Sequence, residues 1–180
     1  AFKIDKHINL SVYSQKNGTK SATITTDFYK IDPNIKIELK TEYANQYNAG
    51  GDNALIDGVI GTEDFRTGTW QGYFDTDVIA IVDLGAVKPI QQLQINFLKD
   101  QRSWIFLPKE VEIYTSNDGK IFKKTTNIPF PIPENKENVS IKTMKLSKLG
   151  NARYVKVIAK KLGILPTWHL GYKHDGRSWL

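Results

Sequence analysis

Apolar and polar residues alternate along much of the chain with the period of two that β-strands require. In the stretch 35–40, for example, Ile and Leu alternate with Lys and Glu. No stretch of a dozen residues carries a convincing helical apolar stripe. The pattern predicts strands at 35–40, 78–84, 90–98, 111–115, 139–149 and 152–159. Many short strands without helices indicate an all-β sandwich or barrel.

Short turn motifs separate these runs. Asn-Asp-Gly at 117–119 is a strong hairpin signal, because glycine tolerates the positive φ that such turns need. If successive strands are antiparallel, the tight turns share one end of the domain and the longer connections share the other. We expect the longer loops to carry recognition, because adaptable loops on a rigid sandwich often bind ligands. The tight turns are 83–88, 117–119 and 149–151, and the longer connections are 99–108, 129–138 and 163–177.

Composition narrows the class of protein. With 180 residues, 40% hydrophobic and 24% charged, the chain suits one folded domain plus a short appendage. Residues 1–34 lack the strong alternation and read as the tail of a preceding small β domain, or a linker, with a lead-in strand; residues 35–180 form the main domain. The final residues, Ser178-Trp179-Leu180, resemble the start of a strand, so we expect a module from a longer protein.

Charge and residue types exclude several functions. The chain has no cysteine, hence no disulfide or thiol nucleophile, and only His7, His169 and His174 as histidines. The net charge is +6, but the lysines are scattered, which favours an ordinary solvated surface and no nucleic-acid partner. The longest apolar run, 78–82, is far too short for a membrane span.

The loop 48–58 contains three glycines and two aspartates. Hard cations such as calcium bind carboxylates and backbone carbonyls, and glycines let a backbone curl around them. Asp57 would be the side-chain ligand, with carbonyls from Ala54 and Val59 and a threonine before Trp70. The alternative, which composition alone favours, is a local turn in which the Asp57 carboxylate accepts from nearby backbone amides.

Two loops, 100–108 and 165–177, combine Trp with Arg, His and Asp. A sugar ring can stack its apolar face on an indole while charged and polar groups bind its hydroxyls. The alternative for each Trp is burial that anchors its loop. We expect burial for Trp70 and Trp179, and we weigh both roles equally for Trp104 and Trp168. His169 could equally be a hydrogen-bonded structural residue.

Catalysis finds little support in the sequence. No GxSxG nucleophile motif is present. A glycosidase needs two opposed carboxylates, and nothing singles out Asp64 with Asp100 or Asp175 as such a pair. The interpretation is therefore a binding module and not an enzyme.

An ordered set of motifs resembles the coagulation factor 5/8 type C (discoidin) family, over roughly residues 35–180. More narrowly, the chain is similar to the family 32 carbohydrate-binding modules at the C-terminus of bacterial family 20 β-N-acetylhexosaminidases, the chitobiases. The motifs are 47–58, Trp70-Gln71-Gly72-Tyr73, Asp83-Leu84-Gly85, 103–108, 116–119, 152–157 and Pro166-Thr167-Trp168-His169.

The resemblance implies an antiparallel jelly-roll β-sandwich. It also implies a structural calcium ion, held by Ala54, Asp57, Val59 and a threonine such as Thr67. The stretch between Gly58 and Trp70 is longer than in many relatives, so the threonine ligand is Thr67, Thr62 or neither. Relatives place a calcium-binding Glu after the last Trp-containing strand, at a point beyond Leu180. In sugar-binding relatives the ligand lies among loops at one end, which here implies Arg102, Trp104, Trp168, His169, Asp64, Arg66 and Asp175.

The function implied by the resemblance is non-catalytic carbohydrate binding, with galactose, GalNAc, GlcNAc or chitooligosaccharides as ligands. The module would keep an attached hexosaminidase catalytic domain near its substrate, as a monomer in the periplasm, at the cell surface or in the secreted fraction of a bacterium. The alternative is a structural module that contacts a protein or an anionic surface. Burial of both Trp104 and Trp168 would favour that alternative.

Overall fold

The computed structural model describes residues 6, 8–28 and 30–180, so His7 lies outside the described part. Strands dominate the chain, and the only helices described are short 3-10 turns. The strands are β1 Ile8–Val12, β2 Gln15–Lys16, β3 Thr19–Lys20, β4 Ile24–Phe28, β5 Lys36–Leu39, β6 Val78–Pro89, β7 Gln92–Lys99, β8 Glu110–Ser116, β9 Lys123–Pro129, β10 Ser140–Ser147 and β11 Asn151–Lys160. The 3-10 turns are η1 Asn45–Tyr47, η2 Ala54–Ile56, η3 Phe65–Thr67, η4 Gln101–Ser103 and η5 Leu170–Lys173.

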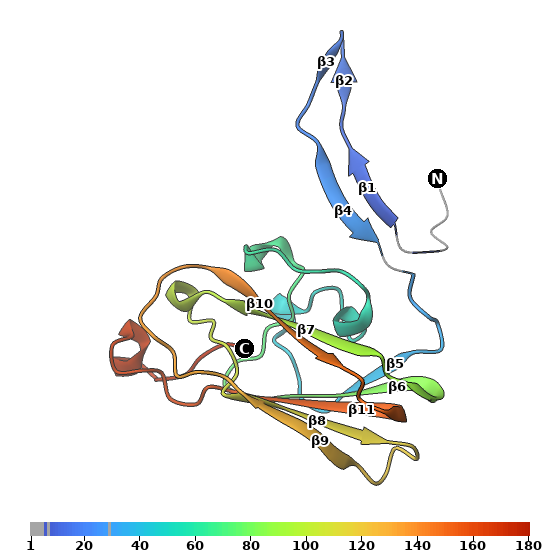
Figure 1. Ribbon diagram of the computed structural model, residues 1–180. Coiled ribbons are helices and arrows are strands. Elements are labelled where there is room, and N and C mark those ends of the chain that lie inside the picture. The colour runs from blue at the N-terminus through green and yellow to red at the C-terminus, as the bar shows by residue number, and fades with distance from the viewer. Residues whose placement is uncertain (1–5, 7, 29) are drawn as a thin grey trace.

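Two antiparallel sheets face each other (Figure 1). The larger has the order β5-β6-β11-β8-β9, and the smaller pairs β10 with β7 over eight residues in register. Alternate side chains of both sheets point inward and form the core, as period-two patterns require. The buried members include Val111, Ile113, Met144, Val155 and Ala159. The antiparallel jelly-roll sandwich expected from the sequence is therefore confirmed.

One predicted turn is wrong. The segment Asp83-Leu84-Gly85 does not end a strand, because β6 continues to Pro89. Gly85 has a φ of 80°, and the pairing of β6 with β11 jumps between Ala152 and Tyr154 at this point. The glycine thus marks a bulge, a place where a strand takes extra residues without ending. The chain turns into β7 after Pro89.

The bulge is held by a two-pronged ion pair. Both carboxylate oxygens of Asp83 accept from the Arg153 guanidinium, from Nε and an Nη, each at 2.9 Å. These hydrogen bonds lower the pKa of Asp83 to about 2 from an ordinary value of 3.8.

We expect acid to weaken the fold through Asp83. Because its folded pKa is depressed, its stabilising contribution is complete above about pH 4 and is lost as the pH falls toward about 2. Urea unfolding at pH 5, 3 and 2 should show this loss, and Asp83→Asn should lose less stability over the same interval. An equal loss in the variant would contradict the assignment.

The two ends of the sandwich differ as the strand polarity predicts. At one end the tight turns meet, with the Ile90 amide donating to the Gly150 carbonyl at 2.8 Å. At the other end the long loops meet. The Gln101 side chain donates to the Glu134 carbonyl at 2.9 Å and accepts from the Lys136 amide at 3.1 Å. We call this second end the loop end.

A β-hairpin formed by β1 and β4 precedes the sandwich, and the short β2–β3 pair closes its tip. It projects away from both sheets (Figure 1). Residue 34 lies between this hairpin and β5. The division of the chain at residue 34 and the origin of the hairpin in a neighbouring domain stay predictions.

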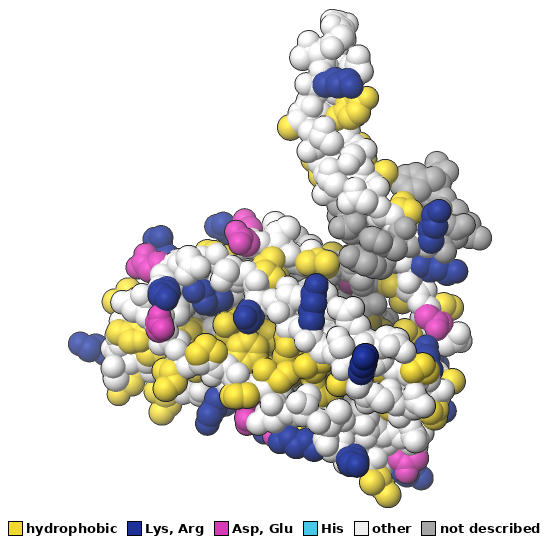
Figure 2. Space-filling model, viewed as in Figure 1, with side chains coloured by type: hydrophobic (Ala, Val, Ile, Leu, Met, Phe, Trp, Pro, Cys, Tyr) yellow, Lys and Arg dark blue, Asp and Glu magenta, His cyan; other side chains and the backbone are white. Residues whose placement is uncertain are grey.

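The surface carries mixed charge. Figure 2 shows Lys and Arg side chains spread over the visible face with Asp and Glu among them, and apolar side chains between β10 and β9. Within the described residues, no helix has the length and apolar character needed to cross a membrane.

Candidate aromatic binding site at the loop end

The η4 turn presents Trp104 in a strained conformation. Asp100 caps the turn, because its Oδ2 accepts from the Ser103 hydroxyl at 2.6 Å and its Oδ1 from the Ser103 amide at 3.4 Å. Trp104 follows with a φ of 65°, in the left-handed region. Bulky residues rarely adopt this conformation, which costs about 1–3 kcal/mol and is concentrated at functional sites. The turn therefore holds this indole in place at the expense of an unfavourable backbone conformation.

His169 ties the C-terminal loop to the η4 turn. Its Nδ1 accepts from the Gly171 amide at 3.1 Å, which places the proton on Nε2, and Nε2 lies 2.7 Å from the Gln101 carbonyl. The side chain is only 9% exposed. With both ring nitrogens engaged inside the protein, His169 holds the structural role that the sequence left open as its alternative.

Both candidate indoles pack on this histidine. The rings of Trp104 and Trp168 lie 5.9 and 5.8 Å from the His169 ring, each nearly perpendicular to it. Phe106, 1% exposed, packs beneath at 5.2 Å from His169 and 6.3 Å from Trp168. A buried phenylalanine and a buried histidine thus fix the positions of two aromatic rings that still reach the surface.

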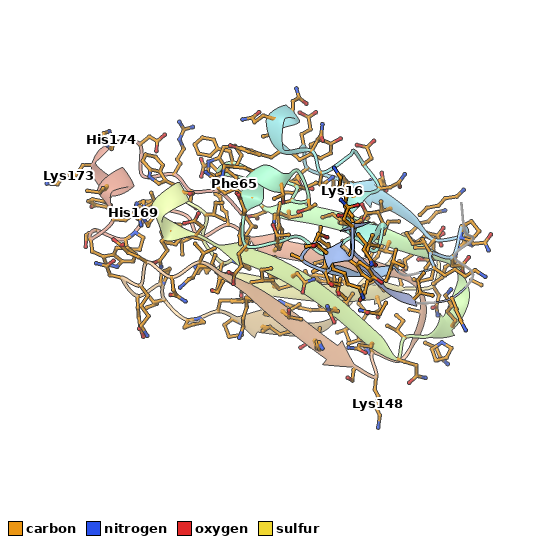
Figure 3. The ribbon with its side chains drawn as sticks, turned by 90° about the horizontal axis from the view of Figure 1, so that it is seen from above. Lys16, Phe65, Lys148, His169, Lys173 and His174 are labelled. Carbon is orange, nitrogen blue, oxygen red and sulfur yellow. The ribbon has the colours of Figure 1, made fainter. Side chains whose placement is uncertain are left out.

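The outer surface of this cluster is aromatic. Trp168 is 36% exposed, Trp104 is partly buried, and the exposed His174 ring lies 6.1 Å from Trp104 at an angle of 30°. Gly171 allows the close approach, because a Cβ there would lie 3.2 Å from Trp104 and 2.8 Å from Leu165. We call Trp104, Trp168 and His174 the aromatic platform. Figure 3 shows His169, Lys173 and His174 at one end of the molecule and Lys148 at the other.

Arg102 lies at the loop end. It is exposed on η4, two residues before Trp104, and its guanidinium has no hydrogen bond or ion pair within the described part of the chain. The other three arginines, Arg66, Arg153 and Arg177, are each paired with an aspartate. Arg102 is therefore available to bind an external oxygen atom.

Asp64 with Arg66 and Asp175 with Arg177 form two matching ion pairs. In each pair the arginine amide donates to the aspartate at 3.0 Å while the guanidinium binds the same carboxylate. The side-chain bond from Arg66 lowers the pKa of Asp64, and the backbone bond from Arg177 lowers that of Asp175. Each pair is internally neutralised, so a ligand would compete with a bond already made.

The η3 turn that carries Asp64 and Arg66 belongs to the same end. Phe65 packs on Tyr47, 5.7 Å between ring centroids, and Tyr47 packs on Trp179 at 5.2 Å. The Trp179 amide in turn donates to the Trp104 carbonyl at 2.9 Å. The structure thus gathers the seven predicted ligand-binding residues at one end, with Trp104, Trp168 and His169 in one cluster and Arg102 two residues from Trp104.

Sequence reasoning missed three contributors to the cluster. In the sequence, His174 is one residue of the loop 165–177, and no role follows for Phe106 or Gln101. The burial of the Phe106 side chain is predictable from its place in the run 103–108, where apolar residues follow the turn. The contact between His174 and Trp104 depends on tertiary structure and has no local signal.

Three aspartates of the loop end, Asp64, Asp100 and Asp175, do not have the properties that a glycosidase requires. A glycosidase requires a carboxylic acid with a raised pKa opposite a second carboxylate. Here the pKa values of Asp64 and Asp175 are lowered, and Asp100 is buried and bonded to Ser103. Each of these three carboxylates accepts hydrogen bonds from a partner of its own chain.

The predicted calcium loop is folded around Asp57. The Asp57 Oδ1 accepts from the Val59 amide at 2.7 Å, which is the local turn that the sequence allowed as an alternative. Its Oδ2 has no partner among the described residues and remains able to bind a cation. Ala54 begins the η2 turn, and Val59 is 58% exposed.

Thr67 lies in a different network. Its hydroxyl donates to the Asp64 carbonyl at 2.9 Å and lies 3.1 and 3.0 Å from the hydroxyls of Thr62 and Thr69. No group of three or more His, Asp or Glu side chains gathers anywhere in the described residues. The calcium site therefore stays a prediction, in which one carboxylate and backbone carbonyls would be the ligands.

Comparison with known proteins assigns the chain to a family. The model of the F5/8 type C domain family matches residues 36–179. A search of curated protein sequences returned no significant match.

Solved structures resemble the chain at low sequence identity. CpGH89CBM32-5 of Clostridium perfringens, in complex with GalNAc-β-1,3-galactose, is 19% identical, with a TM-score of 0.48, covering 81% of this chain and 90% of that one. The C-terminal domain of a chitobiase from Bacteroides fragilis is 19% identical, with a TM-score of 0.46, covering 82% and 89%. The family 32 module of C. perfringens NanJ, in complex with galactose, is 15% identical, with a TM-score of 0.45, covering 81% and 88%.

Proposed function

Since the chain belongs to the F5/8 type C domain family, we propose that residues 35–180 form a non-catalytic carbohydrate-binding module. Its binding site is the aromatic platform together with Arg102. The observation that supports this most strongly is the pairing of two surface-reaching indoles, fixed from below by His169 and Phe106, with the one unpaired arginine.

The chemistry of the platform matches a sugar. The apolar face of a pyranose ring stacks on an indole, and the guanidinium donates to ring hydroxyls. Had Trp104 and Trp168 both been buried, a structural or protein-contact role would have been favoured; instead Trp168 is 36% exposed. Affinity is expected to be weak, because a single sugar residue on a surface platform removes little area from water.

We expect galactose or an N-acetylhexosamine at the end of a glycan to be the ligand, with GalNAc, GlcNAc and chitooligosaccharides as the set to compare. In the parent protein the module would hold a β-N-acetylhexosaminidase near its substrate, in the periplasm, at the cell surface or secreted. A monomer suffices for this role, because the platform is built from one chain.

Arg102→Ala should weaken galactose binding about tenfold, the effect of losing one charge-assisted hydrogen bond of about 1.4 kcal/mol. Calorimetric titration with each sugar, with calcium present, measures the effect. Lys120→Ala is the matched control, because Lys120 is also exposed and cationic but lies in the β8–β9 turn at the opposite end. Equal weakening in both variants, or no heat from any of the four sugars, would contradict the proposal.

We further propose that calcium binds at Asp57 and stabilises the 48–58 loop. At a free calcium concentration of 100 times its Kd, binding adds about 2.7 kcal/mol, or roughly 5–10 °C in Tm for a domain of this size. Thermal unfolding with calcium and with EDTA measures this difference. Asp57→Asn should remove it, and Glu63→Gln, an exposed carboxylate in the next loop, should retain it. A calcium response that survives in Asp57→Asn would place the ion elsewhere.

A further inference from the structure

Two short 3-10 turns of the loop end, η4 and η5, are built alike. The last turn of η4 carries the basic residue Arg102, and the residue that caps its C-terminus is Trp104. The last turn of η5 carries the basic residue Lys173, and its C-terminal cap is His174. Each turn therefore ends in a cation that is followed within two residues by an aromatic ring of the platform.

The two turns dock against each other. The carbonyl of Gln101 in η4 lies 2.7 Å from Nε2 of His169, the N-terminal cap of η5. The rings of the two C-terminal caps lie 6.1 Å apart and are inclined by 30°. Because these contacts hold the turns together, Arg102 and Lys173 flank the same pair of rings along their chains.

Both cations are available to a ligand. Arg102 and Lys173 are exposed, and neither has an ion pair among the residues that the structure describes. Arg177, in the same loop as Lys173, is by contrast bound to Asp175 at 3.0 Å. An external anion would have to compete for Arg177, whereas it can bind the other two cations without breaking an ion pair.

The two loops that carry η4 and η5 have more cations than anions. The charged residues in 99–108 and 163–177 are Lys99, Arg102, Lys173 and Arg177 against Asp100 and Asp175. Asp100 is buried and bonded to a serine, and Asp175 is bound by an arginine, so both carboxylates already have partners. The exposed carboxylates of Glu63 and Glu137 lie on other loops. The platform therefore lies in a locally positive surface.

A neutral hexose would use only part of this arrangement. Its hydroxyls can accept from one guanidinium, which leaves the second cation without an anionic partner. A carboxylate or a sulfate on the sugar offers several oxygen atoms to both cations, and charge-assisted hydrogen bonds are about twice as strong as neutral ones. The planar guanidinium can also bind two oxygen atoms of one anionic group at once.

We propose that the ligand of the aromatic platform is a hexose with an anionic substituent, a carboxylate or a sulfate, which Arg102 and Lys173 bind together while the sugar ring stacks on the platform. This inference rests on the proposed carbohydrate-binding function and names the class of sugar. Lys173 is then a residue that determines specificity, and only the charges of the two loops contribute to it.

The test compares three sugars by calorimetry: methyl galactoside, methyl galacturonoside, which carries a carboxylate, and methyl galactoside 6-sulfate. In about 20 mM salt, where screening is weak, at least one anionic sugar should bind about tenfold more tightly than the neutral one. In about 0.5 M salt this preference should fall several-fold, because the two cations are exposed and their charges are screened.

Variants locate the preference. Lys173→Gln should reduce the ratio of anionic to neutral affinity by about threefold, and the double variant Arg102→Gln/Lys173→Gln should bring it within about twofold of one. Lys148→Gln is the matched control and should retain the full ratio, because Lys148 is also exposed but lies at the opposite end of the molecule (Figure 3).

Each outcome decides the proposal. Equal affinity for neutral and anionic sugars overturns the inference and leaves the proposed carbohydrate-binding function intact. A preference that survives in the double variant, or that Lys148→Gln reduces equally, overturns it as well. A preference for one of the two anionic sugars alone supports it and identifies the substituent. If none of the three sugars binds, both the inference and the proposed function are wrong.

Discussion

Replacing Trp168 with alanine is expected to weaken galactose binding by at least about thirtyfold, or about 2 kcal/mol. This indole is 36% exposed, the more exposed of the two indoles of the aromatic platform, and it supplies an apolar face on which a sugar ring can stack. Calorimetry or a fluorescence titration measures the loss. Because Trp168 already reaches the surface, its removal should leave Tm within a few degrees of the wild-type value.

A matched control separates the loss of the Trp168 indole from the loss of any large apolar side chain in this loop. Leu170→Ala removes another large apolar side chain from the same loop, one that is 84% exposed and makes no aromatic contact in the described structure. It should leave galactose affinity within about twofold. If Trp168→Ala retains wild-type affinity, the ligand does not stack on this indole and the platform has been misassigned.

The second large effect is on stability. Phe106→Ala should lower the free energy of unfolding by about 3–5 kcal/mol, the usual cost of removing a fully buried phenylalanine. Phe106 is 1% exposed and packs against His169 and Trp168. Urea unfolding measures the change. Ile121→Ala, at a side chain that is 79% exposed, should cost less than about 0.5 kcal/mol.

The Phe106→Ala variant also tests whether the core supports the aromatic platform. If Phe106 supports the platform from beneath, the Phe106→Ala protein should bind galactose more weakly even at a temperature where it remains folded. Undiminished affinity in the folded variant would show that the platform does not depend on this residue. A free-energy change under about 1 kcal/mol would contradict its place in the core.

The fold was accessible from sequence because strands that bury one face must alternate. All six strands predicted from alternation are present, with ends within two residues of those expected, except that β6 continues to Pro89. The prediction of a turn at 83–85 is wrong because the sequence Asp-Leu-Gly is equally compatible with a bulge and with a hairpin. Only the pairing partner distinguishes the two, and here the register of β11 across Ala152 and Tyr154 does so. β9 is not among the predicted strands, because it begins at a run of lysines and threonines with too few apolar residues to show alternation.

The candidate site was predictable in its residue types and less so in their roles. Sequence placed Trp104, Trp168 and His169 among the same loops, because strand polarity assigns those loops to one end. It could not distinguish His169 as a buried connector from His174 as a surface ring. That distinction follows from two hydrogen bonds, to Gln101 and Gly171, formed only when the loops dock. Likewise, Arg102 stands out only once the other arginines are seen to be paired.

The net charge of +6 finds no role in sugar recognition. Several lysines take part in ion pairs spread over the molecule, such as Lys124 with Glu112 and Lys161 with Asp75. Exposed pairs of this kind contribute little to stability. We assign the charge to the solvated surface, in keeping with its even distribution over the face seen in Figure 2.

The central claim, that the loop end binds a sugar on the aromatic platform, is tested most directly by NMR. The four tryptophans give four indole N–H signals, assigned by single Trp→Phe variants. We predict that galactose or an N-acetylhexosamine shifts the signals of Trp104 and Trp168. Trp70, whose Nε1 donates to the Thr62 carbonyl at 2.7 Å, should be unaffected. Saturable shifts confined to residues away from the loop end, or no shift with any of the four sugars, would contradict the account.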